Sequence, residues 1–207
     1  VTEVEVFPDD DAFEDPTKPI GRFYAETEAD VLAMTRGWDM VYVENQGWRR
    51  VVPSPIPHKI VQLPTIRRLL EHNVTVVCCG GGGIPVVRHE TNDIQGIEAV
   101  IDKDRVSALL GSALGARRLF LTTGTDAIYR NFASENREKL TELTVSEIEE
   151  MEEEGQFPPG SMGPKVEAAR QFIAGGGEQA IVCTPPDLVR AFSGAAGTRI
   201  IADCTNK

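Results

Sequence analysis

The sequence predicts an α/β protein: a three-layer αβα sandwich around a mainly parallel sheet, with a small protruding subdomain. Two observations lead to this prediction. After residue 58, short and continuously apolar runs alternate with segments whose apolar residues have helical spacing. Strands that are apolar throughout are buried on both faces, as in parallel sheets covered by helices. The first 57 residues are rich in Pro, Asp and aromatic residues, which indicates turns and short strands.

The sequence therefore divides into two parts. Residues 1–57 are predicted to form a lid-like subdomain with its flanks, and residues 58–207 the carboxyl-terminal α/β portion. Within the first part, TEADVLAMTRG predicts one helix that ends at Gly37.

The second part begins with a helix that Pro64 opens and that runs to about His72. The apolar run 74–79 (VTVVCC) then predicts a buried strand that leads into four glycines. The remaining elements follow the same alternation. Strands are expected at 98–102, 118–123, 179–184 and 198–202. Helices are expected after residue 102, from Pro164 with Gly163 as its cap to a stop at Gly175, and from Pro185 or Pro186. The acidic run TVSEIEEMEEEG predicts a solvated helix with a capping box of Ser146 and Glu149, ending at Gly155, to which we assign no function.

Composition limits the classes of function. The chain has 21 Lys and Arg residues against 32 Asp and Glu residues, a formal net charge of −11. This argues against a general surface for nucleic acid or anionic membranes and favours small-molecule partners. There is no apolar run long enough for a membrane span, no CxxC pair and no HExxH motif. We therefore expect a cytoplasmic protein with reduced cysteines and no bound structural metal.

Lys165 breaks a local rule, because it stands at the start of a predicted helix, where acidic residues are preferred. A solvated lysine is the simpler interpretation of this position alone. However, Asp102-Lys103-Asp104 also stands at a helix start. Two lysines at helix starts, with Asp104 able to hold their ammonium groups, suit the transfer of a phosphoryl group, because such transfer needs cations near the equatorial oxygens.

Gly80 to Gly83 follow the predicted strand 74–79. Consecutive glycines allow backbone N–H groups to approach an anion closely. The alternative is a tight turn or a crowded crossing of strands, which the sequence leaves open.

Several segments together resemble one family. IEAVIDKD, GGGGIPV, GSMGPKVEAA, PTKPIGRFY, RRVVPSPIP and the ending GTRII are similar to carbamate kinase, within the amino acid kinase superfamily. The resemblance covers nearly the whole chain. It implies an amino acid kinase-like fold and reversible phosphoryl transfer between ATP and carbamate, giving ADP and carbamoyl phosphate, with Mg²⁺ on the nucleotide. It also implies a homodimer and a role in arginine fermentation, where the reaction runs toward ATP.

The resemblance also implies roles for individual residues. Lys103 and Lys165 would stabilise the transferring phosphoryl group, Asp104 would orient them, and Lys18 would approach the carbamate or phosphate end. Gly80, Gly81, Gly82 and Gly83 would line the acid-substrate side. The nucleotide would be held by Thr123, Asp126, Tyr129, Met162 and Gly163.

The chain departs from the family pattern in two ways. The family reads Thr-Asp-Val-Asp-Gly-Val-Tyr where this chain has TGTDAIY, so that Gly124 and Ala127 replace an aspartate and a glycine. The family's amino-terminal Gly-Gly-Asn loop and second glycine-rich loop have no counterpart, so we expect that about a third of the enzyme is absent. Two alternatives therefore stay open: a non-catalytic nucleotide- or anion-binding protein with this fold, and a kinase of another small carboxylate.

Overall fold

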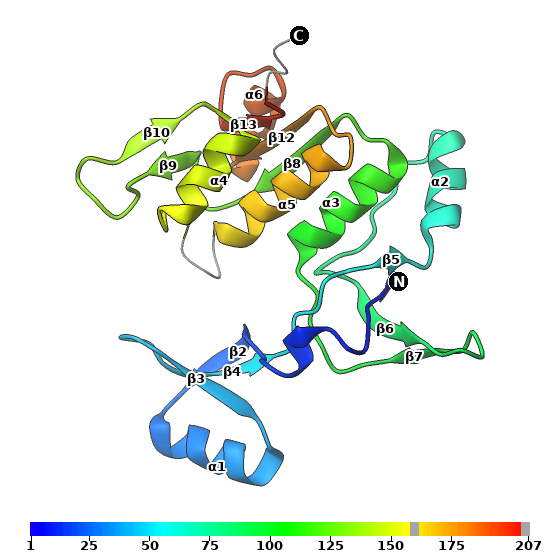
Figure 1. The fold of residues 1–207 in the computed structure, drawn as a ribbon, viewed down its shortest axis with the longest axis vertical. Coiled ribbons are helices and arrows are strands. Elements are labelled where there is room, and N and C mark those ends of the chain that lie inside the picture. Colours follow the sequence, from blue (N-terminus) through cyan, green and yellow to red (C-terminus); the bar gives the residue numbers. More distant parts are fainter. Residues whose placement is uncertain (158–161, 204–207) are drawn as a thin grey trace. The chain divides into compact units, whose positions relative to one another are not determined.

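The computed structural model describes residues 1–157 and 162–203 (Figure 1). It divides the chain into two compact units, Val1–Asp102 and Lys103–Lys207. The predicted boundary after residue 57 falls inside the first unit, because strands from both sides of it pair with one another. β1 (Glu3–Glu5) lies between β5 (Lys59–Ile60) and β6 (Ile84–Arg88).

The main sheet of the first unit has the order β5-β1-β6-β7, where β7 is Ile94–Gly96. β1 and β6 are parallel, and the other two pairs are antiparallel. Val4, Ile60 and Val86 are fully or nearly fully buried around this sheet. The helix expected after Pro64 is confirmed as α2 (Leu63–Glu71), with the proline in its first turn.

A second, antiparallel sheet in the first unit has the order β2-β4-β3 (Lys18–Tyr24, Gly47–Val52 and Asp39–Val43). The predicted helix of this part is α1 (Glu26–Arg36), and it ends at Gly37 as expected, in the left-handed conformation with φ 64°. A short 3-10 helix, η1 (Asp11–Phe13), precedes the sheet.

Two predicted strands of the first unit do not form. Residues 74–79 have an irregular backbone, in which Cys79 has a positive φ of 63°, and Val77 is 97% exposed. A strand buried on both faces needs hydrogen-bonded neighbours, and no described segment of this unit pairs with 74–79. Residues 98–102 are likewise irregular, although Ile101 and Asp102 are buried. The apolar pattern at 98–102 thus reflects burial without sheet pairing.

The second unit contains the strands that the sequence predicts best. Its sheet has the order β11-β13-β12-β8 (Glu142–Thr144, Thr198–Ile201, Gln179–Cys183 and Arg118–Thr122). Two of its strand pairs are parallel, and β12 and β13 are antiparallel. β9 (Ile128–Arg130) and β10 (Glu138–Leu140) form a separate antiparallel hairpin.

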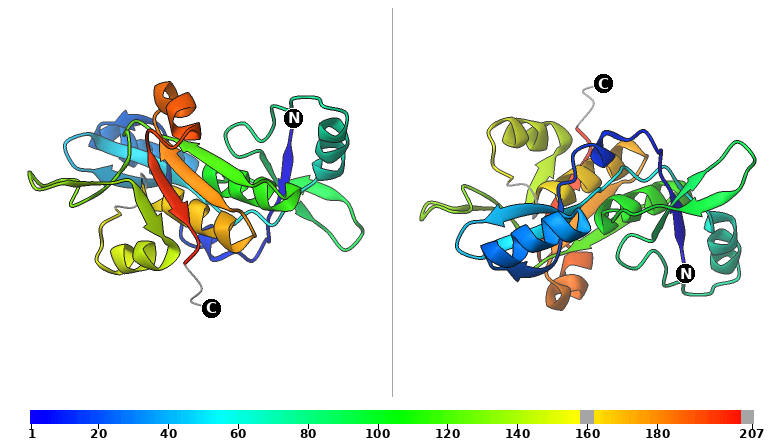
Figure 2. Two further views of the ribbon diagram at one scale, coloured as in Figure 1. Left: turned by 90° about the horizontal axis from the view of Figure 1, so that it is seen from above. Right: turned by 90° about the horizontal axis from the view of Figure 1, so that it is seen from below.

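Helices cover both faces of this sheet, which confirms the predicted three layers (Figure 2). Ala180 and Val182 of β12 pack with α5 (Gly163–Ala174), whereas Ile181 and Cys183 form a small cluster on the opposite face. The other helices are α3 (Lys103–Leu114), α4 (Val145–Glu153) and α6 (Leu188–Phe192), and α6 follows the 3-10 helix η2 (Pro185–Asp187). None of the helices in the described residues has the length and apolar character needed to cross a membrane.

Two predicted helix starts are shifted. The capping box of α4 is formed by Thr144 and Glu147, so the prediction of Ser146 and Glu149 is wrong. Thr144 ends β11 and keeps an extended backbone, so the helix begins directly after it. In α5, Gly163 is the first helical residue, and Met162 occupies the cap position without a side-chain hydrogen bond.

Candidate functional site

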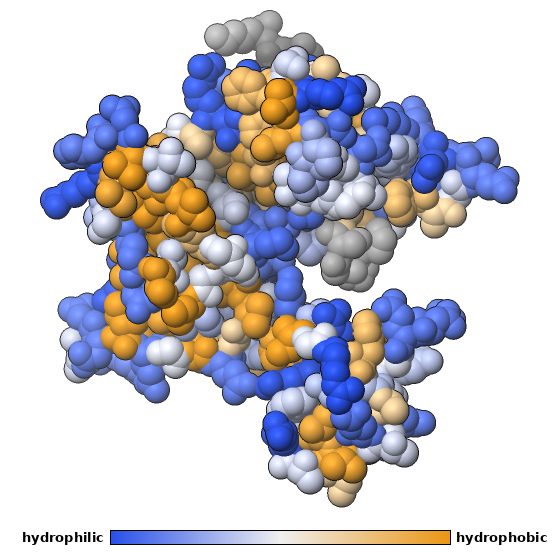
Figure 3. Space-filling model, turned by 180° about the vertical axis from the view of Figure 1, so that it is seen from behind, coloured by the Kyte–Doolittle hydropathy of each residue, from blue (hydrophilic) through white to orange (hydrophobic). Residues whose placement is uncertain are grey.

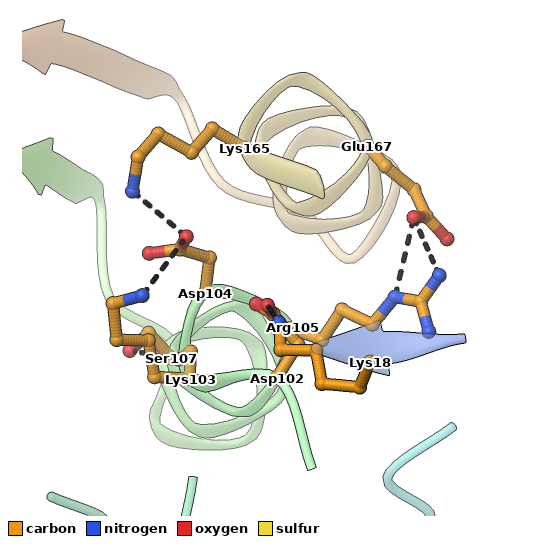
Figure 4. A network of polar contacts seen from close by, with 8 residues as sticks. All are labelled: Lys18, Asp102, Lys103, Asp104, Arg105, Ser107, Lys165 and Glu167. Atoms are coloured by element: carbon orange, nitrogen blue, oxygen red, sulfur yellow. Dashed lines mark hydrogen bonds and ion pairs between the residues drawn. The ribbon is translucent and has the colours of Figure 1, made fainter. Parts of the chain in front are cut away.

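A buried ion pair joins the first turns of α3 and α5 in the second unit (Figure 4). Lys165 Nζ donates to Asp104 Oδ2 at 2.8 Å, and both side chains are only 10% exposed. The ammonium group of Lys103 lies 3.9 Å from the same oxygen, and its side chain is 56% exposed. The structure thus brings together the two lysines and the aspartate that the sequence singles out.

A second ion pair fixes the same two helices. Arg105 Nη2 donates to Glu167 Oε2 at 2.7 Å, and Arg105 Nε donates to the same oxygen at 3.2 Å. Arg105 directly follows Asp104, and Glu167 lies two residues after Lys165. The contact between them therefore limits movement of the two helix starts.

The helices can approach closely because small residues lie between them. A Cβ added at Gly111 of α3 would come within 2.8 Å of the Phe172 ring of α5. Val106 of α3 and Val166 of α5 are completely buried, as the apolar spacing predicts. Packing of the two helices therefore holds Asp104 and Lys165 in register.

Both helix starts also have a positive partial charge from their backbone dipoles. Two ammonium groups lie beside one carboxylate, so the formal charges of the three side chains sum to one positive charge. Such a group of donors suits a phosphoryl group or another small anion.

The predicted nucleotide residues on the loop after β8 form a second polar cluster. Asp126 accepts hydrogen bonds from Tyr129 Oη at 2.8 Å and from Lys139 Nζ at 2.6 Å. These bonds, first that from Lys139, lower the pKa of Asp126 below its ordinary value. The hydrogen bond to Asp126 raises the pKa of both Tyr129 and Lys139. Thr123 is anchored through its backbone N–H, which donates to Cys183 O at 2.9 Å.

Sequence reasoning missed two residues of this loop and hairpin. Lys139 holds Asp126 across the β9–β10 hairpin, and nothing in the local sequence indicates that contact. Thr125 has a buried hydroxyl oxygen without a hydrogen-bond partner among the described residues. The threonine itself stands beside Gly124, where a Cβ would meet nothing within 4 Å. The loop therefore has open space at Gly124, and the next residue, Thr125, has a hydroxyl without a hydrogen-bond partner among the described residues.

The loop before α5 is only partly described. Met162 packs against the core cluster of the second unit, and its backbone oxygen accepts from the N–H groups of Lys165 and Val166. Gly160 and Ser161 of the predicted loop lie outside the described residues.

The remaining predicted residues belong to the first unit. Lys18 Nζ donates to Asp102 Oδ2 at 2.5 Å, where the lysine side chain is 30% exposed and that of the aspartate 6% exposed. The contact of Asp102 with Lys18, 84 residues away, was not predictable from either motif.

The four glycines differ from one another. A Cβ at Gly82 would lie 2.0 Å from Ile101 O, and one at Gly83 would lie 2.6 Å from a Val4 methyl group. A side chain would not fit at Gly82 or Gly83, which supports the alternative of a tight turn or a crowded crossing for these two glycines. At Gly80 and Gly81 a Cβ would meet nothing within 4 Å. Gly80, Gly81 and Gly83 line a cavity of about 440 Å³, which also borders residues 77–79.

Comparisons with known proteins agree with the sequence motifs. Carbamate kinase from Staphylococcus haemolyticus is 47% identical over 201 residues, and that from Halobacterium salinarum is 44% identical over 203 residues. Each match covers 97% of this chain and 65% of the relative, so the chain spans about two thirds of the length of these relatives. A solved carbamate kinase from Giardia lamblia bound to AMP-PNP is 43% identical, with a TM-score of 0.86, and the match covers 98% of this chain and 64% of the other.

A second solved structure, the Giardia lamblia enzyme bound to citric acid, has a TM-score of 0.89 at 43% identity over the same shares of the two chains. The model of the amino acid kinase family matches residues 24–184, which include the helix starts of α3 and α5 and the loop after β8. The chain belongs to the amino acid kinase family.

Proposed function

We propose that this chain carries the nucleotide-binding and phosphoryl-binding part of a carbamate kinase, which transfers a phosphoryl group reversibly between ATP and carbamate. The observation that supports this most strongly is the buried Lys165–Asp104 pair with Lys103 beside it. The resemblance also implies small-molecule substrates, a homodimer, a cytoplasmic location and net flux toward ATP in arginine fermentation. These remain parts of the proposal.

The ammonium groups of Lys103 and Lys165 stabilise the negative charge of the phosphoryl group while it is transferred. In phosphoryl transfer, charge spreads over three equatorial oxygens, and catalysis depends on positioning and on cations near those oxygens. Asp104 holds the ammonium group of Lys165 in place through a hydrogen bond of 2.8 Å. Lys103 is more exposed and can turn toward the arriving anion. Lys18 approaches the carbamate or phosphate end of the substrates, and glycines 80–83 line the acid-substrate side, as the resemblance implies.

Mg²⁺ is expected to arrive with the nucleotide and to neutralise phosphate charge. Magnesium in such reactions is bound by one or two carboxylates together with substrate phosphates. Asp104 and Asp126 both accept hydrogen bonds from lysine ammonium groups, so neither is arranged as part of a metal cage of protein ligands. Within residues 1–157 and 162–203, no three His, Cys, Asp or Glu side chains gather as metal ligands.

The proposal is tested by comparing two nucleotides that differ in one phosphoryl group. Calorimetry with Mg²⁺ measures the affinity of the chain for ADP and for AMP-PNP. Lys165→Met is expected to weaken binding of AMP-PNP at least about tenfold more than binding of ADP, because only AMP-PNP has the group assigned to this lysine. Equal losses for both nucleotides would show that Lys165 serves only the structure.

Lys103 offers a matched control in Lys59. Their side chains are 56% and 58% exposed, and each ammonium group lies 3.9 Å from one carboxylate oxygen. Lys103→Met should weaken AMP-PNP binding, whereas Lys59→Met should leave it unchanged. The same variants can be assayed for ATP formation from ADP, Mg²⁺ and carbamoyl phosphate.

A non-catalytic nucleotide-binding protein is the second candidate. It is favoured by Gly124, which stands where the family pattern has an aspartate, and by the match to only 65% of the relatives' length. Such a protein would bind ADP without forming ATP in the assay. Any ATP formed that disappears in Lys165→Met would exclude it.

A further inference from the structure

The sheet of the second unit is covered differently on its two faces. Ala180 and Val182 pack with α5 on one face. On the other face, Ile181 and Cys183 form the small apolar cluster with Ala191 of α6. A cavity of about 540 Å³ opens at this cluster and is lined by the strands and by residues 191–197. Its volume lies in the range that holds small-molecule ligands.

The register of the strands brings polar side chains together on this face. Ile181 of β12 lies opposite Arg199 of β13, and Arg199 lies opposite Glu142 of β11. Two residues before Ile181, Gln179 lies opposite Arg118 of β8. All five residues line the cavity. A sheet face that packs under another layer is apolar, whereas four of these five residues are polar or charged. This part of the face is therefore suited to water or to a polar ligand.

Both arginines keep N–H groups for a ligand. Arg118 Nη1 donates to Phe192 O at 3.4 Å, and Arg118 Cζ lies 5.2 Å from the centroid of the Phe192 ring. The Nε and Nη2 groups of Arg118 have no hydrogen-bond partner among the described residues. Arg199 donates to Glu142 Oε2 through Nε and Nη2, which leaves its Nη1 without a partner in the same part of the chain. Each guanidinium group is thus held in place with donors to spare.

The charged side chains of the lining favour an anion. They are Arg118, Arg199, Lys139 and Glu142, so three positive and one negative formal charge leave two positive charges, in a chain whose net charge is −11. Lys139 also pairs with Asp126 outside the lining, so the available donors are those of the two arginines. β12 lies between the strands of these arginines, which places their backbones about 10 Å apart across the sheet. Two guanidinium groups at this spacing suit a ligand with an anionic group at each end.

We propose that this cavity binds a small dicarboxylate, whose two carboxylates are joined by a short carbon chain. One carboxylate accepts hydrogen bonds from Arg118 and the other from Arg199, while the carbon chain lies against Ile181. Figure 3 shows orange and blue side chains next to one another at the top of the view, the level at which Figure 1 places α6. The cavity is on the opposite face of the sheet from α5, which carries Lys165, so it is separate from the candidate phosphoryl site. This inference does not depend on the proposed reaction.

Calorimetry with two probes of equal length tests the requirement for two charges. Glutarate has a carboxylate at each end, and glutaramate has an amide in place of one of them. Glutarate is expected to bind at least about tenfold more tightly, because only glutarate can form a charge-assisted contact with both arginines. Succinate and adipate extend the series to a shorter and a longer chain. Equal binding of glutarate and glutaramate, or no binding of any of the three dicarboxylates at about 10 mM, would overturn the proposal.

Variants locate the bound glutarate. Arg118→Met and Arg199→Met should each weaken its binding at least about tenfold. Arg117→Met is the matched control, because Arg117 is the neighbour of Arg118, pairs with Glu178 and does not line the cavity. This control and Lys165→Met should leave the affinity unchanged. Loss of binding in Lys165→Met, with no loss in Arg118→Met, would place glutarate at the phosphoryl site and refute the proposal.

Glu142 gives a test with the opposite sign. Its carboxylate is the only acidic group among the described residues that line the cavity, and it occupies two donors of Arg199. Glu142→Gln should therefore strengthen glutarate binding, whereas loss of a merely structural contact would weaken it. Amide chemical shifts supply a second readout: residues 179–181 and 197–199 should shift with glutarate. Shifts confined to the starts of α3 and α5, or weaker binding by Glu142→Gln, would contradict the assignment of this cavity.

Discussion

Asp104→Asn removes the charge that compensates Lys165 at the start of α5. Both side chains of this pair are 10% exposed, so the variant leaves a buried ammonium group without the carboxylate that holds it at 2.8 Å. Breaking a buried pair from one side costs about 3–5 kcal/mol. For a chain of this size, 1 kcal/mol corresponds to about 2–4 °C in melting temperature, so the expected loss is about 6–20 °C.

The two partners of the pair should not be equivalent. Lys165→Met leaves Asp104 with Lys103 3.9 Å away, so this variant should cost less than Asp104→Asn. The double variant Asp104→Leu/Lys165→Met replaces both charges by apolar groups and should recover most of the lost stability, as replacement of buried ion pairs often does.

Urea unfolding followed by circular dichroism measures the three variants against the wild type. Asp104→Asn should be less stable than Lys165→Met, and the double variant should be more stable than Asp104→Asn. A cost below about 1 kcal/mol for Asp104→Asn would be typical of an exposed pair and would refute the assignment of this pair as buried and structurally demanding.

Two further predictions follow from the geometry. Gly82→Ala should destabilise the chain by more than about 1 kcal/mol, because residue 82 has a φ of +130° and its Cβ would lie 2.0 Å from a backbone oxygen. Gly81→Ala should be tolerated, because its Cβ would meet nothing within 4 Å. Thermal unfolding of the two variants measures the difference. Asp126→Asn should lower the pKa of Tyr129, which is followed by the ultraviolet absorbance of the phenolate. Because the folded-state pKa of Asp126 is lowered, its carboxylate stabilises the fold above its ordinary pKa, and that contribution is lost as the pH falls through the folded value.

The sequence predicts the second unit better than the first, and two similar runs show why. QAIVCT and VTVVCC are both short, apolar and rich in β-branched residues or cysteine. The first becomes β12, which has β8 and β13 as hydrogen-bonded neighbours. The second has no neighbour among the described residues and stays irregular. An apolar run indicates that a segment suits burial in a sheet, but the partner strands come from elsewhere in the chain and are not written in the run itself.

In the candidate site, too, some residues were predictable from the local sequence and some contacts were not. Asp104 and Lys165 were predictable because each stands at a helix start, a position that the local sequence defines. The contact of Asp126 with Lys139 depends on the register of the β9–β10 hairpin, and that of Lys18 with Asp102 spans 84 residues. Contacts of this kind arise from tertiary packing, which single-sequence patterns do not encode.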